Sequence, residues 1–282
     1  MKVIFSRKGF DSANGGMPSP ILPDGRLAWF PIPSTSDCDA IGGVFGQDCT
    51  LLGDLSKGRW SNNTRVHFDP DLVESRKLRE AGWRPSLGQN GAAESHLRSQ
   101  GVDIGDVFIF FSWFRDVRQR HGRWEYVSGA PDLHVMFGWL EVGEIFDVGS
   151  NRQDCLVRAP WIRSHPHIYC SKRSADTRNV IYVAARRSRF SPRLAGSGLF
   201  DTLKQQMVLT AAGRSRSVWC LPRSFYPHSG LGLSYHRDLK RWALTPNSAL
   251  LRTVAKGQEF VVDVREDPDL RDWVSRLIVE NV

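Results

Sequence analysis

The sequence predicts an α+β fold, with a central mixed or antiparallel β-sheet and a few flanking helices. Three observations predict it. Strand-like apolar runs are spread along the whole chain. Amphipathic helical segments are few. No internal repeat, low-complexity segment or long linker divides the 282 residues. We therefore expect one domain over residues 1–282.

The clearest predicted strand covers residues 107–114. Apolar side chains fall on both of its faces, which is typical of a strand at the centre of a sheet. Residues 133–146 predict a second long strand or a bent pair, in which Gly138 and Gly143 permit a bulge or a kink. Further strands are expected over residues 2–5, 179–184 and 260–264.

Two internal helices are predicted from their first residues. Asp69 before Pro70 is a good cap for a helix over residues 70–81. Asn90 similarly introduces a helix over residues 92–100. A glycine directly follows each segment and marks its end.

The C-terminal helix has the strongest pattern. Asp267 and Pro268 provide its cap and first turn. An apolar stripe then follows at helical spacing, and we expect it to pack on the sheet. The stripe consists of Leu270, Trp273, Val274, Leu277 and Ile278.

Two segments are similar to small β-barrel domains of the PUA, ASCH and EVE type. They are residues 104–108 and residues 137–145, each with glycine beside an apolar strand. The resemblance implies a partly closed β-barrel as an alternative to an open sheet, and such barrels hold RNA or a flipped modified base. The same Gly-Asp pattern is also that of an ordinary turn, so both architectures stay open.

The composition indicates a nucleic-acid or nucleotide partner without proving one. A formal net charge of +8 attracts phosphates at long range. The planar guanidinium of arginine suits paired contacts with phosphate and stacking on bases. Solvated surface loops are the alternative interpretation of each arginine cluster. The clusters lie at residues 115–120, 186–189 and 214–216.

The chain is expected to be cytoplasmic, with neither a signal peptide nor a membrane span. No apolar run approaches the roughly 20 residues that cross a bilayer. The five cysteines are odd in number and contain no CxxC pair, so we expect neither a disulfide framework nor a zinc knuckle. They are Cys38, Cys49, Cys155, Cys170 and Cys220.

Several stretches together resemble a bacterial and phage family, nucleotide modification associated domain 3. The resemblance implies a domain linked to modified nucleobases in DNA, and it supplies no reaction mechanism. It extends across most of the chain. The matching stretches are residues 5–12, 15–20, 67–72, 87–97, 110–115, 133–145 and 165–168.

The loop after the first strand is a candidate site. A strand ending at Phe5 delivers Arg7, Lys8 and Asp11 to the end of the sheet. Arg7 and Lys8 are candidates to hold phosphate, and Asp11 faces a sugar or base. The alternative is a capped surface turn with an arginine–aspartate ion pair. The glycine spacing fits neither a Walker loop nor a dinucleotide fingerprint.

The start of the helix at residues 92–100 is a second candidate. Gln89 and Asn90 can each recognise a base edge through paired hydrogen bonds. His96 is a candidate general acid or base, with a structural histidine as the alternative. Glu94 lies only two positions from His96, so the two side chains diverge on a helix and cannot share a metal.

The histidines give no complete metal site. His165 and His167 flank Pro166, and in an extended segment both rings point to the same side. Such a pair suits a metal or a phosphate. His134 and Glu141 lie on opposite faces of a regular strand, unless a bulge at Gly138 brings them together. No metal is therefore assigned, and His134 and His167 are predicted to bind the nucleotide.

Aromatic and basic residues meet at the end of the central strand. The chain has ten tryptophans, most of which we expect in the core. Trp113 is the candidate platform for an unstacked base, and Arg115 beside it is a candidate phosphate contact.

The leading hypothesis is an enzyme that acts on a modified base, or on its glycosidic bond, in DNA, in DNA modification or phage defence. Asp11 or His96 would be its acid or base, and Asp11 would stabilise oxocarbenium-like charge in a glycosylase-like or transglycosylase-like reaction. We expect Arg7, Asp11 and His96 to converge on one pocket beside Trp113.

Two other functions stay open. A non-catalytic reader of modified bases would need an aromatic cage and a basic rim without a poised titratable group. A metal-dependent hydrolase or oxygenase would use the histidine pair at residues 165 and 167. The residue pattern names no cofactor.

Overall fold

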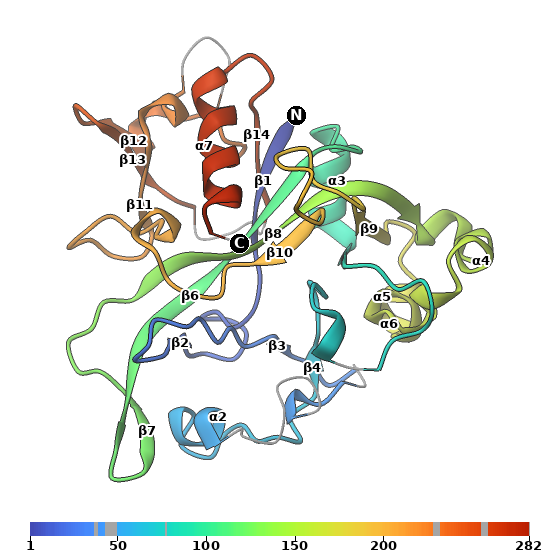
Figure 1. Cartoon of the computed structure of the whole chain (residues 1–282), viewed down its shortest axis with the longest axis horizontal. Helices are drawn as coiled ribbons and strands as arrows, with labels where there is room; N and C mark the ends of the chain where they lie inside the picture. The colour runs from blue at the N-terminus through green and yellow to red at the C-terminus, as the bar shows by residue number, and fades with distance from the viewer. Residues whose placement is uncertain (37–38, 43–49, 77, 228–231, 255–258, 282) are drawn as a thin grey trace.

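The centre of the fold is a nine-stranded mixed sheet. The computed structural model describes residues 1–36, 39–42, 50–76, 78–227, 232–254 and 259–281. Six strands follow the order β14-β1-β6-β8-β9-β5, and β2, β7 and β10 pair with β6 or β8 beside this path (Figure 1). The predicted α+β class is confirmed, and within the described ranges the ladder does not close into a barrel.

Two small sheets and several helices surround the large sheet. The strands of the large sheet are β1 (Lys2–Arg7), β2 (Ser19–Ile21), β5 (Ser86–Gln89), β6 (Val107–Arg120), β7 (Arg123–Tyr126), β8 (Leu133–Asp147), β9 (Val180–Ala184), β10 (Ser197–Leu199) and β14 (Glu259–Asp263). The small sheets contain β11 (Val218–Pro222), β12 (Trp242–Leu244) and β13 (Ser248–Arg252), and β3 (Ile32–Pro33) with β4 (Val66–His67). The helices are α2 (Thr50–Leu55), α3 (Gly91–Ser99), α4 (Val148–Arg158), α5 (Pro166–Tyr169), α6 (Ser171–Ser174) and α7 (Pro268–Val279).

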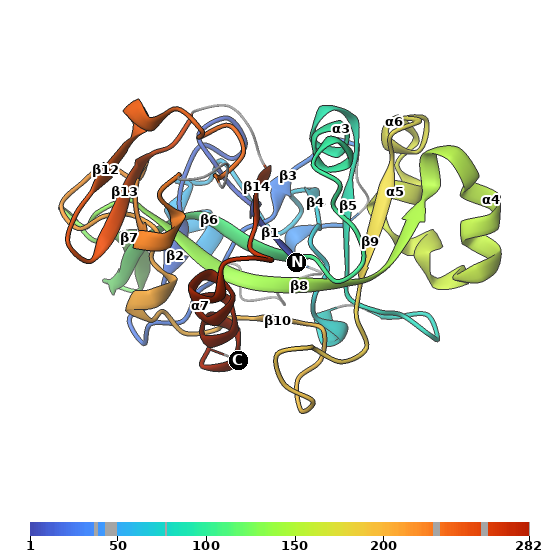
Figure 2. The ribbon, with the colours of Figure 1, turned by 90° about the horizontal axis from the view of Figure 1, so that it is seen from above.

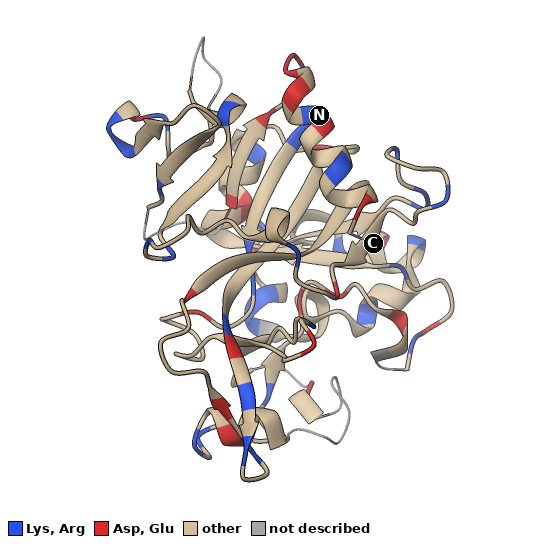
Figure 3. Cartoon of the chain, turned by 60° about the vertical axis from the view of Figure 1, so that its left-hand side comes forward, with Lys and Arg blue, Asp and Glu red and all other residues tan. Residues whose placement is uncertain are grey.

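These elements lie at different ends of the large sheet. The short helices α4, α5 and α6 gather at one end, beyond β9, and the β11–β13 sheet lies at the other (Figures 1 and 2). The central strands carry almost no charged residues, whereas both signs of charge are spread over loops and element ends (Figure 3). The charged side chains are therefore concentrated around the sheet rather than within it.

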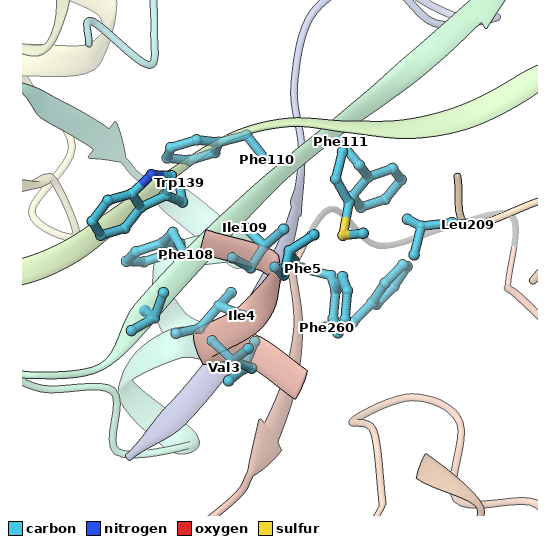
Figure 4. Close-up of a cluster of buried hydrophobic side chains, with 14 of the residues drawn as sticks. Val3, Ile4, Phe5, Phe108, Ile109, Phe110, Phe111, Trp139, Leu209 and Phe260 are labelled. Atoms are coloured by element: carbon cyan, nitrogen blue, oxygen red, sulfur yellow. The ribbon is translucent and has the colours of Figure 1, made fainter. Parts of the chain in front are cut away.

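The central strand forms as predicted because it buries both faces. Every residue from Val107 to Ser112 is buried, and β6 pairs with β1 in parallel and with β8 antiparallel. Phe5, Phe111 and Phe260 come from three adjacent strands and pack in one cluster (Figure 4). The strand is longer than predicted, because its exposed end pairs with β7.

The glycines of β8 act as predicted. The segment is one long strand whose register shifts opposite Phe110 and Phe111, next to Gly138, and again between Val142 and Glu144. A Cβ atom on Gly143 would lie 2.4 Å from the Cα of Ala185. A side chain there would collide with backbone, so glycine permits the bulge.

Two predicted helices are confirmed. α3 begins directly after Asn90, although the Asn90 side chain makes no capping hydrogen bond. α7 begins after Asp267, whose carboxylate accepts a hydrogen bond from the Leu270 amide at 2.9 Å. The predicted stripe of α7 faces the core, with Trp273 partly buried at its margin.

We expect Asp267→Ala to lower the free energy of unfolding by about 1 kcal/mol, because it removes the acceptor of the Leu270 amide, which has no partner within the first turn of α7. Asp272→Ala is the control, since Asp272 lies on the same helix and forms an exposed ion pair with Arg276. Urea unfolding of the two variants measures the difference. Equal losses in both would contradict the capping role.

The helix predicted over residues 70–81 is wrong. Among the described residues of this segment only Glu74–Arg76 form a 3₁₀ turn. The Asp69 carboxylate accepts hydrogen bonds from the Gly88 amide instead of capping a helix. Asp71 bridges to Ser86 and forms an ion pair with Arg79 at 2.5 Å. Distant partners therefore hold this segment in an irregular path.

No helix of the described ranges combines the length and the apolar character needed to cross a membrane. Cys155, Cys170 and Cys220 carry free thiols. Cys38 and Cys49 lie outside the described residues.

Candidate functional site

A polar cavity of about 580 Å³ lies where segments far apart in the sequence meet. This volume is in the range of small-molecule sites. Its walls are formed by five segments: the end of β1, the segment after β3, the end of β4, the end of β5 and the α5–α6 region. The lining residues are Arg7, Lys8, Asn14, Ile32, Pro33, Ser34, Thr35, Ser36, His67, Asp69, Gly88, Gln89, Asn90, His167, Lys172, Arg173 and Asp176.

The two edges of the large sheet meet beside this cavity. β5 and β14 are the two ends of the strand order. The Gln89 side-chain amide nevertheless donates a hydrogen bond to Glu259 of β14. The edges are joined here by side chains rather than by a backbone ladder, and Gln89 and Lys8 thereby reach the same cavity.

Glu259 anchors a buried charged network. It is 1% exposed, and its Oε1 lies 3.4 Å from Lys8 Nζ and 3.0 Å from the Ser6 hydroxyl, which donates to it. Burial raises the pKa of Glu259, while Lys8 and the Ser6 hydrogen bond oppose the rise. Within the described part of the chain, Oε2 of Glu259 has no hydrogen-bond partner.

The half-buried side chain of Arg7 forms part of the cavity wall. Its Nε is buried and has no hydrogen-bond partner among the described residues. Burial lowers the pKa of Arg7, and Arg216 also lowers it, while Asp11 and Glu259 act in the opposite direction. The guanidinium lies 5.8 Å from the ring centre of Phe111. An anion in the cavity would supply the missing acceptor.

Two imidazoles flank one buried carboxylate. His67 Nε2 lies 3.5 Å and His167 Nε2 lies 3.7 Å from Oδ2 of Asp69. Burial tends to raise the pKa of Asp69. The hydrogen bond to His67 and the charges of His67, Lys8 and His165 outweigh it and hold that pKa well below its usual range. Burial lowers the pKa of His167 far below its ordinary value. These three residues offer ligand atoms within 4.8 Å of one another and could hold a metal ion.

His167 is fixed by its surroundings. Its Nδ1 lies 2.6 Å from Oδ1 of Asn179, and the Asn179 amide donates to the His167 carbonyl at 2.8 Å. A Cβ atom on Gly88 would lie 2.2 Å from the ring, so only glycine leaves space for it. His165 and His167 do not form the expected extended pair, because His165 caps α5 and accepts a hydrogen bond from the His167 amide.

Five of the predicted site residues come together in the cavity lining: Arg7, Lys8, Gln89, Asn90 and His167. The lining does not include Asp11, whose carboxylate accepts hydrogen bonds from the Ala13 and Asn14 amides in a tight turn. It does not include His96 either. That ring lies 2.9 Å from the Ser234 hydroxyl and contacts the Tyr235 ring at a tilted angle, and burial lowers the pKa of His96.

The other predicted residues make contacts outside this lining. Trp113 donates a hydrogen bond to Asp132, and the Arg216 guanidinium lies 3.8 Å from its ring centre. Arg115 lies 3.8 Å from the same aspartate. His134 is buried and accepts a hydrogen bond from Trp219. Of the four residues expected to share one pocket, the lining of this cavity contains Arg7, and the roles of the others stay predictions.

The remaining histidine–carboxylate pair is also separated. Glu141 pairs with Arg189 at 2.9 Å, whereas His134 faces Trp219. The register shift near Gly138 is present, but these two residues have different partners.

His67, Asp69 and Glu259 are not among the site residues predicted from the sequence. His67 and Asp69 are two positions apart at the end of a short strand, a spacing that places both side chains on one side. Asp69 was interpreted as a helix cap because proline follows it. Glu259 gives no comparable signal, because only its buried position next to Lys8 makes it notable.

The fold and the cavity define an α+β protein with a basic, polar site that is large enough for a small-molecule ligand. The family model of nucleotide modification associated domain 3 matches residues 2–263, and the chain belongs to this family. No curated protein and no solved structure gives a significant match to the chain. The family links the chain to nucleotide modification.

Proposed function

We propose that this protein is an enzyme that binds a nucleotide of DNA in the cavity and acts on its base or glycosidic bond. The buried Nε of Arg7, which has no hydrogen-bond partner among the described residues, carries the proposal. A buried N–H group that loses water without gaining an acceptor is costly. Phosphate supplies charge and several acceptor oxygens together.

The other lining residues support a bound nucleotide. Lys172 and Arg173 add positive charge beside Arg7. Asn90 lies at the start of α3, where an amide side chain can recognise a base edge. Asp69 and its two histidine neighbours are the acid–base groups nearest to such a ligand. Asp11 and His96 stay proposed catalytic residues, although the described lining of this cavity includes neither of them.

The described lining favours an enzyme over a reader of modified bases. A reader needs an aromatic cage around the base. The cavity lining contains imidazole rings and no tryptophan, tyrosine or phenylalanine. It does contain a buried titratable cluster beside the cationic groups, and strongly shifted pKa values are typical of catalytic sites.

The test measures binding and turnover separately. Fluorescence anisotropy with short DNA and with nucleoside monophosphates gives affinities over a range of salt. We expect Arg7→Met to weaken binding by about tenfold or more, and to reduce the salt dependence by about one phosphate contact. Arg118→Met is the control, because that arginine forms an exposed ion pair with Glu125.

Turnover is tested on canonical and hypermodified DNA, with nucleosides quantified by mass spectrometry. Asp11→Asn, His96→Ala and Asp69→Asn compare the candidate acids and bases. Loss of product in one of them, with affinity retained, identifies a residue needed for the reaction. Failure of the wild-type protein to bind any DNA or nucleotide at low salt would refute the proposal.

A further inference from the structure

We propose that His67, Asp69 and His167 bind one divalent transition-metal ion at the wall of the cavity. The three side chains come from the end of β4, the segment after it and helix α5. Their ligand atoms lie within 4.8 Å of one another. Two imidazoles with one carboxylate form a donor set that binds Zn²⁺ or Fe²⁺. The metal site depends on this geometry alone, whereas its position beside a nucleotide rests on the proposed function.

The contacts of Asn179 direct the free nitrogen of His167 toward Asp69. The Asn179 amide group donates to the His167 carbonyl, which leaves Oδ1 facing the ring. Nδ1 must therefore carry the proton and donate it to Oδ1. In the neutral ring Nε2 is then an acceptor, and it faces Oδ2 of Asp69 at 3.7 Å.

Two acceptors that face each other in a buried site need a cation between them. Asp69 is 3% exposed and His167 is 2% exposed, so water screens their repulsion poorly. A metal ion bound by both atoms, and by Nε2 of His67 at 3.5 Å from the same oxygen, removes this conflict. A proton shared with His67 is the competing explanation, and it predicts no specific metal affinity.

The surroundings also resemble those of metal ligands. Metal-bound histidine commonly donates its second nitrogen to a carbonyl oxygen, as His167 does to Asn179. The ligand carboxylate is oriented by the Gly88 amide, which lies 3.0 Å from each of its oxygens. Because all three residues line the cavity, positions that the protein leaves open on the metal face a ligand or water.

The experiment uses the full chain after removal of metals with a chelator. Co²⁺ is titrated first, because its visible absorption reports the ligands, followed by Zn²⁺ and by Fe²⁺ without oxygen. We expect one ion per chain and an absorption spectrum typical of nitrogen and oxygen ligands. Because Zn²⁺ binds most nitrogen and oxygen sites more tightly than Fe²⁺, only an Fe²⁺ affinity that equals or exceeds the Zn²⁺ affinity would indicate an iron site.

Three variants locate the bound ion. Asp69→Asn and His167→Ala should each weaken Co²⁺ binding about 100-fold or more, since each removes a direct ligand. His67→Gln is a milder third variant, because this ring is 13% exposed and its loss disturbs the interior less. His121→Asn, in the exposed turn between β6 and β7, should leave binding unchanged.

The outcomes separate this inference from the proposed function. Absence of a 1:1 complex with all three metals would overturn the metal site, as would equal Co²⁺ affinity in the wild type and in all three ligand variants. Circular dichroism establishes which variants are folded. If Asp69→Asn and His167→Ala are not folded, the Co²⁺ affinity of His67→Gln tests the metal site. One bound ion without any nucleotide affinity would support the metal site and refute the nucleotide function.

Discussion

Lys8→Met should lower the free energy of unfolding by about 3–5 kcal/mol at neutral pH, because it leaves the buried Glu259 carboxylate without its cation. Lys8 and Glu259 are 6% and 1% exposed, so solvent cannot replace the lost partner. Methionine keeps most of the side-chain volume, which limits the loss of packing. Chemical unfolding at several pH values measures the effect.

The loss should shrink as the pH falls. Burial raises the pKa of Glu259 above its unfolded value, so the folded protein binds a proton that the unfolded chain has released. The contribution of Glu259 to stability is therefore largest below the ordinary pKa of a glutamate, and it decreases as the pH rises through the folded pKa. Removal of Lys8 raises that pKa further and enlarges the decrease.

The double variant Lys8→Met, Glu259→Gln is the matched control. It removes both charges, so it should recover most of the stability lost in Lys8→Met and show a weaker pH dependence. If Lys8→Met costs the same at acidic and neutral pH, the ion pair is not the cause of the loss. If the double variant is no more stable than Lys8→Met, the loss comes from packing.

Gly88→Ala should damage the site and the fold together. The added methyl would lie 2.2 Å from the His167 ring, and pairing with β9 holds the Gly88 backbone in place. Because Asn179 also holds the ring, something must shift, at a cost of about 1–3 kcal/mol. Displacement of His167 should also weaken Co²⁺ binding by about 10- to 100-fold.

Gly53→Ala is the comparison for this substitution. Gly53 lies inside α2, and the nearest atom to its added Cβ would be the Trp60 carbonyl oxygen at 4.0 Å. Alanine favours a helix over glycine, so we expect unchanged or slightly higher stability. Thermal unfolding and Co²⁺ titration compare the variants. If Gly88→Ala binds Co²⁺ as tightly as the wild type does, the His167 ring moves without weakening metal binding.

The arginine clusters stay predicted nucleic-acid contacts, and the described lining of the cavity does not include them. Several of their members form ion pairs with nearby acids, as Arg118 does with Glu125 and Arg189 with Glu141. Their charge is partly neutralised at the surface. Of the cavity cations, Arg7 ends a single buried strand and Lys8 directly follows it, and no count of basic residues distinguishes these positions.

Local patterns in the sequence determined the elements that bury apolar surface. Two-sided burial identifies β6, and a cap followed by a stripe identifies α7, because these signals lie within one segment. Local patterns also predicted five of the lining residues: Arg7 and Lys8 at a strand end, Gln89 and Asn90 at the start of a helix, and His167 in a histidine pair.

Only the tertiary structure decided which of these residues act together. Asp69 has the sequence signature of a helix cap, yet its carboxylate meets Gly88 and His167, which are 19 and 98 positions away. Lys8 and Glu259 are almost the whole chain apart, and the antiparallel pairing of β1 with β14 brings them together. A local pattern records the conformation that a segment prefers, but the partner of a buried charge is set by whichever distant group satisfies it when the core packs.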